Sequence, residues 1–271
     1  RGCSFHFYDE RINLQAHSLI EFESSLRQAL RRNEFELHYQ PRVDLGTGRI
    51  VGLEGLIRWR HPERGLLGPG EFIPLAEETG LIVPMGYWVI ARACHDLARM
   101  QKRGMPPVHV AVNMSFRQFQ DSRLLSTVRR LLERTGIDPH WLEFELTETA
   151  VMQQPEQVLM TMDGMTGLGL RFSLDDFGTG FSSFVHLHSL PINLLKIDRG
   201  FVKAIAERSA DRQLVGAMIE MGHSLGLEVV AEGVEQREQL DILRSLGCDQ
   251  VQGFFISPAL PFDELCYFMD A

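Results

Sequence analysis

The sequence predicts an α/β protein, a modified TIM-type (β/α)8 barrel whose first strand runs antiparallel to its neighbour. From about residue 35 onward, short apolar runs alternate with longer amphipathic runs, which is typical of parallel strands joined by helices. About eight such runs fall within roughly 235 residues, and this density favours a closed barrel over an open sheet. Only PRVDLGTGR separates the first two runs, which is too short for the crossover that a parallel pair needs.

The candidate strands recur along the chain at intervals of about one strand–helix unit. The first two are expected to form an antiparallel hairpin across PRVDLGTGR. The strands read as apolar on both faces, as in a parallel sheet that is covered by helices. In chain order they lie near Phe35–Gln40, Ile50–Trp59, Val108–Asn113, Leu142–Thr147, Arg171–Asp175, Leu194–Asp198, Glu228–Ala231 and Gln250–Phe255.

Amphipathic segments between the strands predict the covering helices. Arg117–Thr135 and Ala204–Leu225 carry apolar residues at intervals of three and four positions, as one face of a helix does. Glycines stand where helices are expected to end, and prolines stand where they are expected to begin. These positions are Gly136, Gly226 and Gly247 for the ends, and Pro155 and Pro261 for the beginnings.

The N-terminal stretch departs from the barrel pattern. Ser18–Arg32 reads as a charged amphipathic helix, and the preceding CSFHFYDERIN resembles a strand and turn without a partner in this chain. We therefore expect residues 1–17 to be the tail of an upstream domain, 18–33 to be a linker helix, and 34–271 to be the barrel. The length of 271 residues is ample for one large core.

The charge balance excludes some classes of partner. With 27 basic and 36 acidic residues, the net charge of −9 disfavours DNA or RNA polymers and anionic membranes. The sequence has no apolar stretch of about 18 residues that could span a bilayer. We expect this domain to be cytoplasmic, even if the full-length protein is anchored in a membrane through segments outside this sequence. The cysteines show no zinc-ligand spacing and are expected to be reduced thiols; they are Cys3, Cys94, Cys248 and Cys266.

Polar residues end one candidate strand after another. Because active sites of (β/α)8 barrels lie at the carboxyl ends of the strands, these side chains are expected to share one site. Their carboxylates outnumber the single lysine, two divalent cations would balance the charge, and oxygen ligands suit Mg²⁺ or Mn²⁺. Two such ions can activate water against a phosphodiester, with the lysine to orient or deprotonate that water. The residues are Glu54, Asn113, Glu145, Asp175, Asp176, Lys196, Glu232 and Gln252.

Most of these residues also have an ordinary structural explanation. Asn113 is placed to cap a helix that begins near Phe116, and Asp176 is placed to form a turn. Lys196 is placed to pair with Asp198 at the surface. A helix N-terminus, a loop carboxylate or a strand bulge would explain Glu145, Glu148, Glu232 and Gln252. Their recurrence about once per strand–helix unit favours a joint site.

Residue chemistry alone leaves two points open. Arg58, at the expected mouth of the barrel, can bind a phosphate bidentately or form a salt bridge within the barrel. A lysine among acidic metal ligands also suits a barrel enzyme that abstracts a proton alpha to a carboxylate, which would cleave no phosphodiester.

Longer motifs give the chain a family resemblance. They read YQPRVDLGTGRIVGLEGLIRWRHPERG, FIPLAEETGLI, VNMSFRQF, ELTET, LDDFGTGFSS, LPINLLKIDRGFV, VVAEGVE and QGFFISP. With these motifs, the segment from about Glu34 to Phe268 resembles the EAL domain family of cyclic-di-GMP-specific phosphodiesterases. The resemblance implies the modified barrel, hydrolysis of cyclic-di-GMP to linear 5′-pGpG with two Mg²⁺ or Mn²⁺ ions, and a homodimer.

The resemblance also implies roles for individual residues. The metal ligands would be Glu54, Asn113, Glu145 and Asp175 for the first ion, and Asp175, Asp176 and Glu232 for the second. The catalytic positions would be Glu54, Lys196 and Glu232. The substrate-binding positions would be Gln40, Leu56, Arg58, Gln252 and Glu235, and Glu148 would support the loop after the aspartate pair.

The chain departs from the family pattern at a few positions. The signature tripeptide has Gly55 in place of alanine, which loosens the strand beside a metal ligand and affects rate more than metal binding. Phe181 and Phe184 replace the usual Tyr and Leu in a loop that couples the site to dimerisation in the family. CSFHFYDERIN resembles the end of a GGDEF domain, which implies an upstream GGDEF or sensory domain. The alternative activity is an EAL receptor module that binds cyclic-di-GMP without cutting it.

Overall fold

Eight strands close into a barrel, which confirms the predicted fold class. The computed structural model describes residues 10–178, 187 and 189–270. The barrel order is β1-β2-β4-β5-β6-β7-β8-β9, and it closes because β1 pairs with both β2 and β9. The strands are β1 (Phe35–Asp44), β2 (Ile50–His61), β4 (His109–Asn113), β5 (Leu142–Thr147), β6 (Arg171–Phe177), β7 (Leu194–Ile197), β8 (Glu228–Ala231) and β9 (Gln250–Gln252).

The first strand runs antiparallel to both of its barrel neighbours, as the short connection predicts. The turn after Asp44 closes with hydrogen bonds from Asp44 N to Arg49 O (2.9 Å) and from Gly48 N to Asp44 O (2.8 Å). Gly48 has a φ of 69°, a conformation that glycine adopts without steric cost. Two short strands extend this hairpin, β3 (Gly65–Leu67) on β2 and β10 (Leu260–Pro261) on β1.

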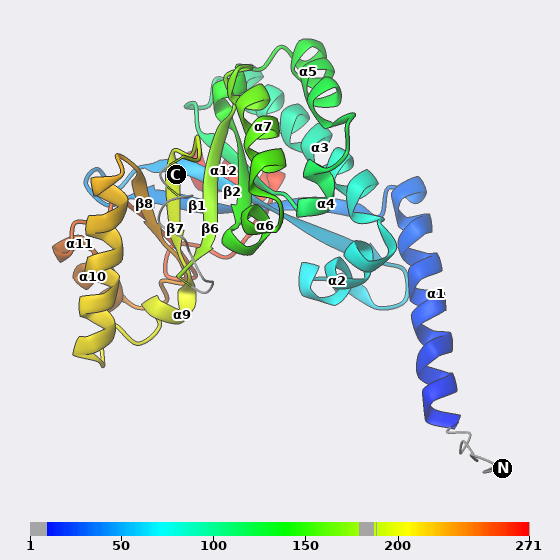
Figure 1. The fold of residues 1–271 in the computed structure, drawn as a ribbon, viewed down its shortest axis with the longest axis horizontal. Coiled ribbons are helices and arrows are strands. Elements are labelled where there is room, and N and C mark those ends of the chain that lie inside the picture. The colour runs from blue at the N-terminus through cyan, green and yellow to red at the C-terminus, as the bar shows by residue number, and fades with distance from the viewer. Residues whose placement is uncertain (1–9, 179–186, 188, 271) are drawn as a thin grey trace.

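Helices cover the outside of the barrel (Figure 1). They are α1 (Glu10–Arg32), α2 (Pro69–Thr79), α3 (Ile82–Lys102), α4 (Phe116–Phe119), α5 (Leu124–Thr135), η1 (Pro139–Trp141), α6 (Glu148–Gln153), α7 (Pro155–Thr166), α9 (Arg199–Val202), α10 (Ser209–Ser224), α11 (Arg237–Ser245) and α12 (Phe262–Asp270). None of the helices in the described part of the chain is long and apolar enough to cross a bilayer.

Two helices differ from the sequence prediction. The segment expected as one helix over Arg117–Thr135 forms α4 and α5, because the side chain of Asp121 accepts from the backbone N–H of Arg123 and ends the first helix in a turn. The expected helix over Ala204–Leu225 begins only at Ser209. Gly136 ends α5 as predicted, with a φ of 67° and its N–H bonded to Leu132 O.

The N-terminal helix is longer than the sequence suggests. It begins at Glu10 rather than near residue 18, so the strand and turn expected there are wrong over residues 10–13, and residues 1–9 lie outside the described part. Its last turns pack through fully buried Leu26 and Ala29, whereas Leu19 and Ile20 are 52% and 62% exposed. In Figure 1 the helix extends away from the barrel.

Many positions on the inner faces of the strands are polar, and this corrects the prediction that the strands are apolar on both faces. In β5, the side chain of Phe144 is fully buried in the hydrophobic core. The side chain of Glu143, the preceding residue, instead forms an ion pair with Arg42 of β1. Strands β1 and β5 are not neighbours in the sheet, so this contact crosses the inside of the barrel. The apolar core therefore lies between strands and helices, and the barrel interior holds charged groups.

Candidate active site

Four carboxylates converge on one buried lysine at the carboxyl ends of the strands. The Nζ atom of Lys196 on β7 lies 2.8 Å from Glu145 and 2.6 Å from Glu232, and its side chain is fully buried. It also lies 3.5 Å from both Glu54 and Asp175. These residues come from five different strands, with Glu54 inside β2 and the others near or just beyond a carboxyl end, so the barrel itself brings them together. Lys196 makes no surface pair with Asp198, whose side chain instead accepts from Gly200 N and caps α9.

Side-chain amides hold Glu54 from two sides. Asn113 Nδ2 donates to Glu54 Oε1 (2.8 Å), and Gln252 Nε2 donates to Glu54 Oε2 (2.5 Å). Gln252 also donates to Gln40 Oε1 (3.1 Å), which lies opposite Glu54 in the hairpin register. The helix-cap explanation for Asn113 is therefore wrong. The N-terminus of α4 is instead supported by Gln118, whose side chain accepts from Ser115 N.

The aspartate pair occupies an irregular end of β6. Asp176 has a φ of 55°, which is uncommon for a residue other than glycine, and its N–H donates to Asp175 Oδ1 (2.9 Å). The pairing register between β6 and β7 shifts between Leu174 and Phe177, so the strand bulges at the two aspartates. This bulge directs Asp175 to Lys196 within the cluster.

Glu148 contacts the chain two residues beyond the aspartate pair. It is the first residue of α6, it is almost completely buried, and its Oε2 accepts from Gly178 N (3.4 Å). This contact lies at the start of the loop that Glu148 is expected to support. The substitutions at Phe181 and Phe184 fall outside the described residues.

The charges of the cluster are unevenly matched. Burial raises the pKa of Glu145 well above its ordinary value, although Lys196 opposes the shift. Burial also raises the pKa of Glu232 to about 7. For Lys196, burial disfavours the charged form, but Asp175 and the surrounding glutamates outweigh it and raise the pKa. For Glu54, burial is outweighed by Lys196 and by the amide donors, and the pKa is lowered. The cluster thus contains more carboxylate groups than the single ammonium group of Lys196 can neutralise.

The sequence prediction missed an ion pair directly beneath the cluster. Arg42 Nη1 donates to Glu143 Oε1 (2.7 Å), and both side chains are almost completely buried. The available signal was the alternation along the strands, since Arg42 stands two positions after Gln40, and Glu143 stands two positions before Glu145. Residues at this spacing share one face of a strand.

Three predicted substrate-binding residues lie outside the hydrogen-bonded cluster. Leu56 is half-buried and lines a neighbouring cavity. Arg58 is half-buried and donates to Ile57 O (3.0 Å), and its burial lowers its pKa. Glu235 is exposed, and its backbone N–H donates to Gln239 Oε1 (2.8 Å).

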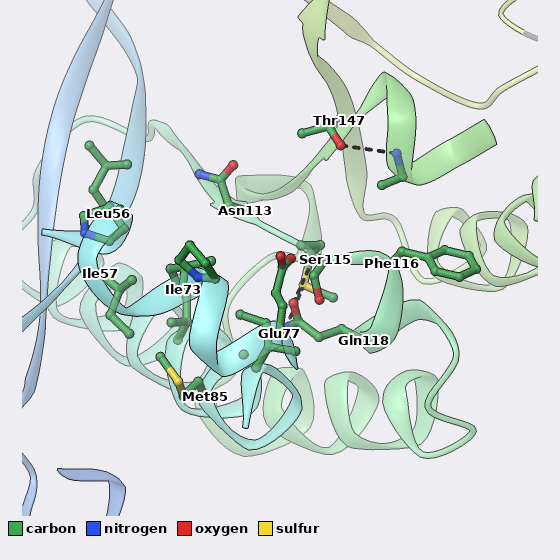
Figure 2. A pocket seen from close by; sticks show the side chains of 18 of the residues that line it. Leu56, Ile57, Ile73, Glu77, Met85, Asn113, Ser115, Phe116, Gln118 and Thr147 are labelled. Carbon is green, nitrogen blue, oxygen red and sulfur yellow. Dashed lines mark hydrogen bonds between the residues drawn. The ribbon is translucent and has the colours of Figure 1, made fainter. Parts of the chain in front are cut away.

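A cavity of about 600 Å³ opens beside the carboxylate cluster. Figure 2 shows Leu56 and Asn113 at its edge, Ile73 and Glu77 of α2 along one wall, and Met85 of α3. Since Asn113 also donates to Glu54, the cavity and the cluster share a wall. A mostly apolar cleft with a few polar groups is typical of a binding site for a small organic molecule.

The donor set of the cluster suits a hard divalent cation. Its side chains offer oxygen atoms, which Mg²⁺ and Mn²⁺ prefer, and Glu145 Oε1 is buried without a hydrogen-bond partner. Within residues 10–178, 187 and 189–270, no three His, Cys, Asp or Glu side chains are already arranged as a metal site. Lys196 Nζ lies between these carboxylates, 2.8 Å from Glu145 and 2.6 Å from Glu232. A cation that binds here therefore competes with this ammonium group.

Comparisons with known proteins agree with the geometry. The EAL domain family profile matches residues 23–259. In Pseudomonas aeruginosa, the bifunctional diguanylate cyclase/cyclic di-GMP phosphodiesterase MucR is 40% identical over 259 residues, which are 96% of this chain and 38% of the relative. The cyclic di-GMP phosphodiesterase NbdA of the same organism is 42% identical over 265 residues, which are 98% of this chain and 34% of the relative. This chain thus spans little more than a third of these relatives.

A solved structure shares the fold over nearly the whole chain. It is named PaMucR phosphodiesterase, c-di-GMP complex, and it is 42% identical with a TM-score of 0.87. The match covers 92% of this chain and 99% of that chain.

Proposed function

Because this chain belongs to the EAL domain family, we propose that it hydrolyses one phosphodiester of cyclic-di-GMP and releases linear 5′-pGpG. The observation that carries the proposal is the group of four carboxylates around buried Lys196, beside an open cavity at the mouth of the barrel. A receptor that only binds the nucleotide has no need for so many costly buried carboxylates. Relatives named as cyclic di-GMP phosphodiesterases support the same substrate.

We propose that two Mg²⁺ or Mn²⁺ ions complete the site. When bound, they would polarise the phosphoryl oxygens and lower the pKa of the attacking water. The residues that would hold them are Glu54, Asn113, Glu145, Asp175, Asp176 and Glu232. The unpartnered Oε1 atom of Glu145 and the excess of carboxylates support this assignment.

The remaining residues would position water and substrate. Lys196, which reaches both Glu145 and Glu232, would orient the attacking water between them. Gln252 and Gln40 would keep Glu54 in place through their shared hydrogen bonds. The proposed substrate contacts are Leu56 at the cavity wall, Arg58 as a bidentate phosphate ligand, and Glu235.

The direct test is to incubate the purified chain with cyclic-di-GMP and Mn²⁺ and to separate the products by anion-exchange chromatography. The Glu54→Ala variant removes one proposed ligand, and Glu220→Ala, at an exposed position of α10, is the matched control. We expect metal-dependent pGpG from the wild type and the control, and none from Glu54→Ala. Unchanged turnover in Glu54→Ala would contradict the ligand assignment. Micromolar binding of intact nucleotide without product would instead identify a receptor.

A further inference from the structure

Charges of alternating sign continue below the proposed active site into the barrel. Lys196 contacts Glu145 Oε2 at 2.8 Å, and Arg42 Nη1 lies 3.9 Å from the other oxygen, Glu145 Oε1. One layer deeper, Glu143 binds Arg42, and Arg171 Nε lies 3.9 Å from Glu143 Oε2. Glu145 is therefore flanked by two cations, one toward the mouth of the barrel and one beneath.

The strands provide a fitted space for the deeper cation. Arg42 pairs in register with Gly52 of β2, and a Cβ atom at Gly52 would lie only 2.5 Å from Nε and Nη2 of the guanidinium group. The guanidinium is clamped by Glu143, with Nη1 at 2.7 Å from Oε1 and Nη2 at 3.4 Å from Oε2. Two contacts to one carboxylate fix the plane of an arginine. Arg42 thus has one defined position in the buried interior of the barrel.

This position leaves Glu145 in an unusual state. Its Oε1 atom is buried without a hydrogen-bond partner, and the clamped guanidinium faces it at 3.9 Å, too far for a hydrogen bond. The positive charge of Arg42 offsets the negative charge of Glu145, but Arg42 makes no hydrogen bond to Glu145 Oε1. We propose that Arg42 is a positioning residue, which holds Glu145 with Oε1 available to a divalent cation. This inference rests on the proposed metal-dependent function.

Two variants test the position of Arg42 without changing net charge. Arg42→Lys keeps the charge but loses the planar clamp, because an ammonium group is a mobile point donor. Gly52→Ala keeps the arginine but fills its space. Arg171→Lys is the matched control, since Arg171 lies in the same charge series but contacts Glu143 rather than Glu145.

The first readout is Mn²⁺ affinity by isothermal titration calorimetry, with thermal unfolding to confirm the fold. We expect Arg42→Lys and Gly52→Ala to bind Mn²⁺ about tenfold more weakly or worse, as is typical when a residue that orients a metal ligand is lost. Arg171→Lys should stay within about twofold of the wild type, by the same reasoning. If Gly52→Ala does not fold, Arg42→Lys decides alone.

The second readout is the Mn²⁺ dependence of hydrolysis. Excess Mn²⁺ should restore the activity of Arg42→Lys, whereas damage unrelated to metal binding would persist at every concentration. If the wild type binds Mn²⁺ and Arg42→Lys binds it equally well, the role of Arg42 is refuted and the proposed function stands. If the wild type binds no Mn²⁺, the two-ion proposal fails, and this inference fails with it.

Discussion

Replacing Lys196 with methionine tests whether this ammonium group holds the carboxylate cluster together. Its Nζ atom lies 2.6 to 3.5 Å from four carboxylates. At these distances each attraction is about 5–6 kcal/mol with an effective dielectric constant of 20, before the cost of desolvation. Removing one partner of a buried ion pair costs about 3–5 kcal/mol net, because it leaves the other charges buried and uncompensated. We expect Lys196→Met to destabilise the metal-free domain by that amount.

The assay is thermal unfolding in EDTA and again with Mn²⁺. For a domain of this size the expected loss lowers the Tm by on the order of 10 °C in EDTA. Because a divalent cation replaces the lost positive charge, Mn²⁺ should raise the Tm of the variant more than that of the wild type. Lys203→Met, at an exposed position, is the matched control and should change stability by less than about 0.5 kcal/mol.

Two results would refute this reasoning. A Tm in EDTA within about 2 °C of the wild type, a change of less than about 1 kcal/mol, would mean that the carboxylates do not depend on Lys196. Equal Mn²⁺ shifts in the variant and the wild type would mean that the cation does not take over the role of the ammonium group.

Further predictions address other parts of the barrel. Tyr39→Phe removes the hydrogen bond to Asp96 Oδ2 (2.8 Å) and should cost about 1 kcal/mol in urea unfolding. Gly55→Ala should stabilise by roughly 0.5 kcal/mol through reduced unfolded-state entropy. A lower urea midpoint would contradict this and would show that the 3.3 Å approach of the added Cβ to Ala111 O outweighs the gain. Burial, with Arg171 nearby, lowers the pKa of His109 to about 4, so stability should decline as the pH falls from about 6.5 toward 4. His109→Gln should show a smaller decline in urea midpoints between pH 7 and 5.

The convergence of the candidate site residues could be predicted from the sequence because strand ends in a barrel converge. Asn113 and Glu145 each follow a recognisable apolar run near a strand end, whereas Glu54 lies within β2, and parallel pairing brings all three to one face. The antiparallel direction of the first strand could also be predicted from the sequence, since only nine residues separate the first two expected strands. Both predictions depend on local patterns, namely run length and spacing, and the structure confirms the fold that they imply.

The boundaries of strands and helices were harder to predict from the sequence because contacts between distant residues set them. The last strand was expected to reach Phe255, but β9 ends at Gln252. At Gly253 the chain turns against Val234, so closely that a Cβ at Gly253 would overlap its backbone, and Phe255 N donates to Val234 O (2.9 Å). No pattern within the segment reveals that contact, because it joins positions in two different loops.

The polar interior explains why the lower half of the site escaped the sequence prediction. Within its own strand, a single Glu143 or Arg42 among apolar neighbours looks like an exception to the apolar pattern. Their significance comes from a contact across 101 positions of sequence, between two strands that are not neighbours in the sheet. Burial of either charge alone would be costly, so each residue makes sense only with the other. In a barrel with a charged interior, polar residues that recur at every second position of a strand therefore have to be compared with those of other strands. A comparison along one strand does not reveal such ion pairs.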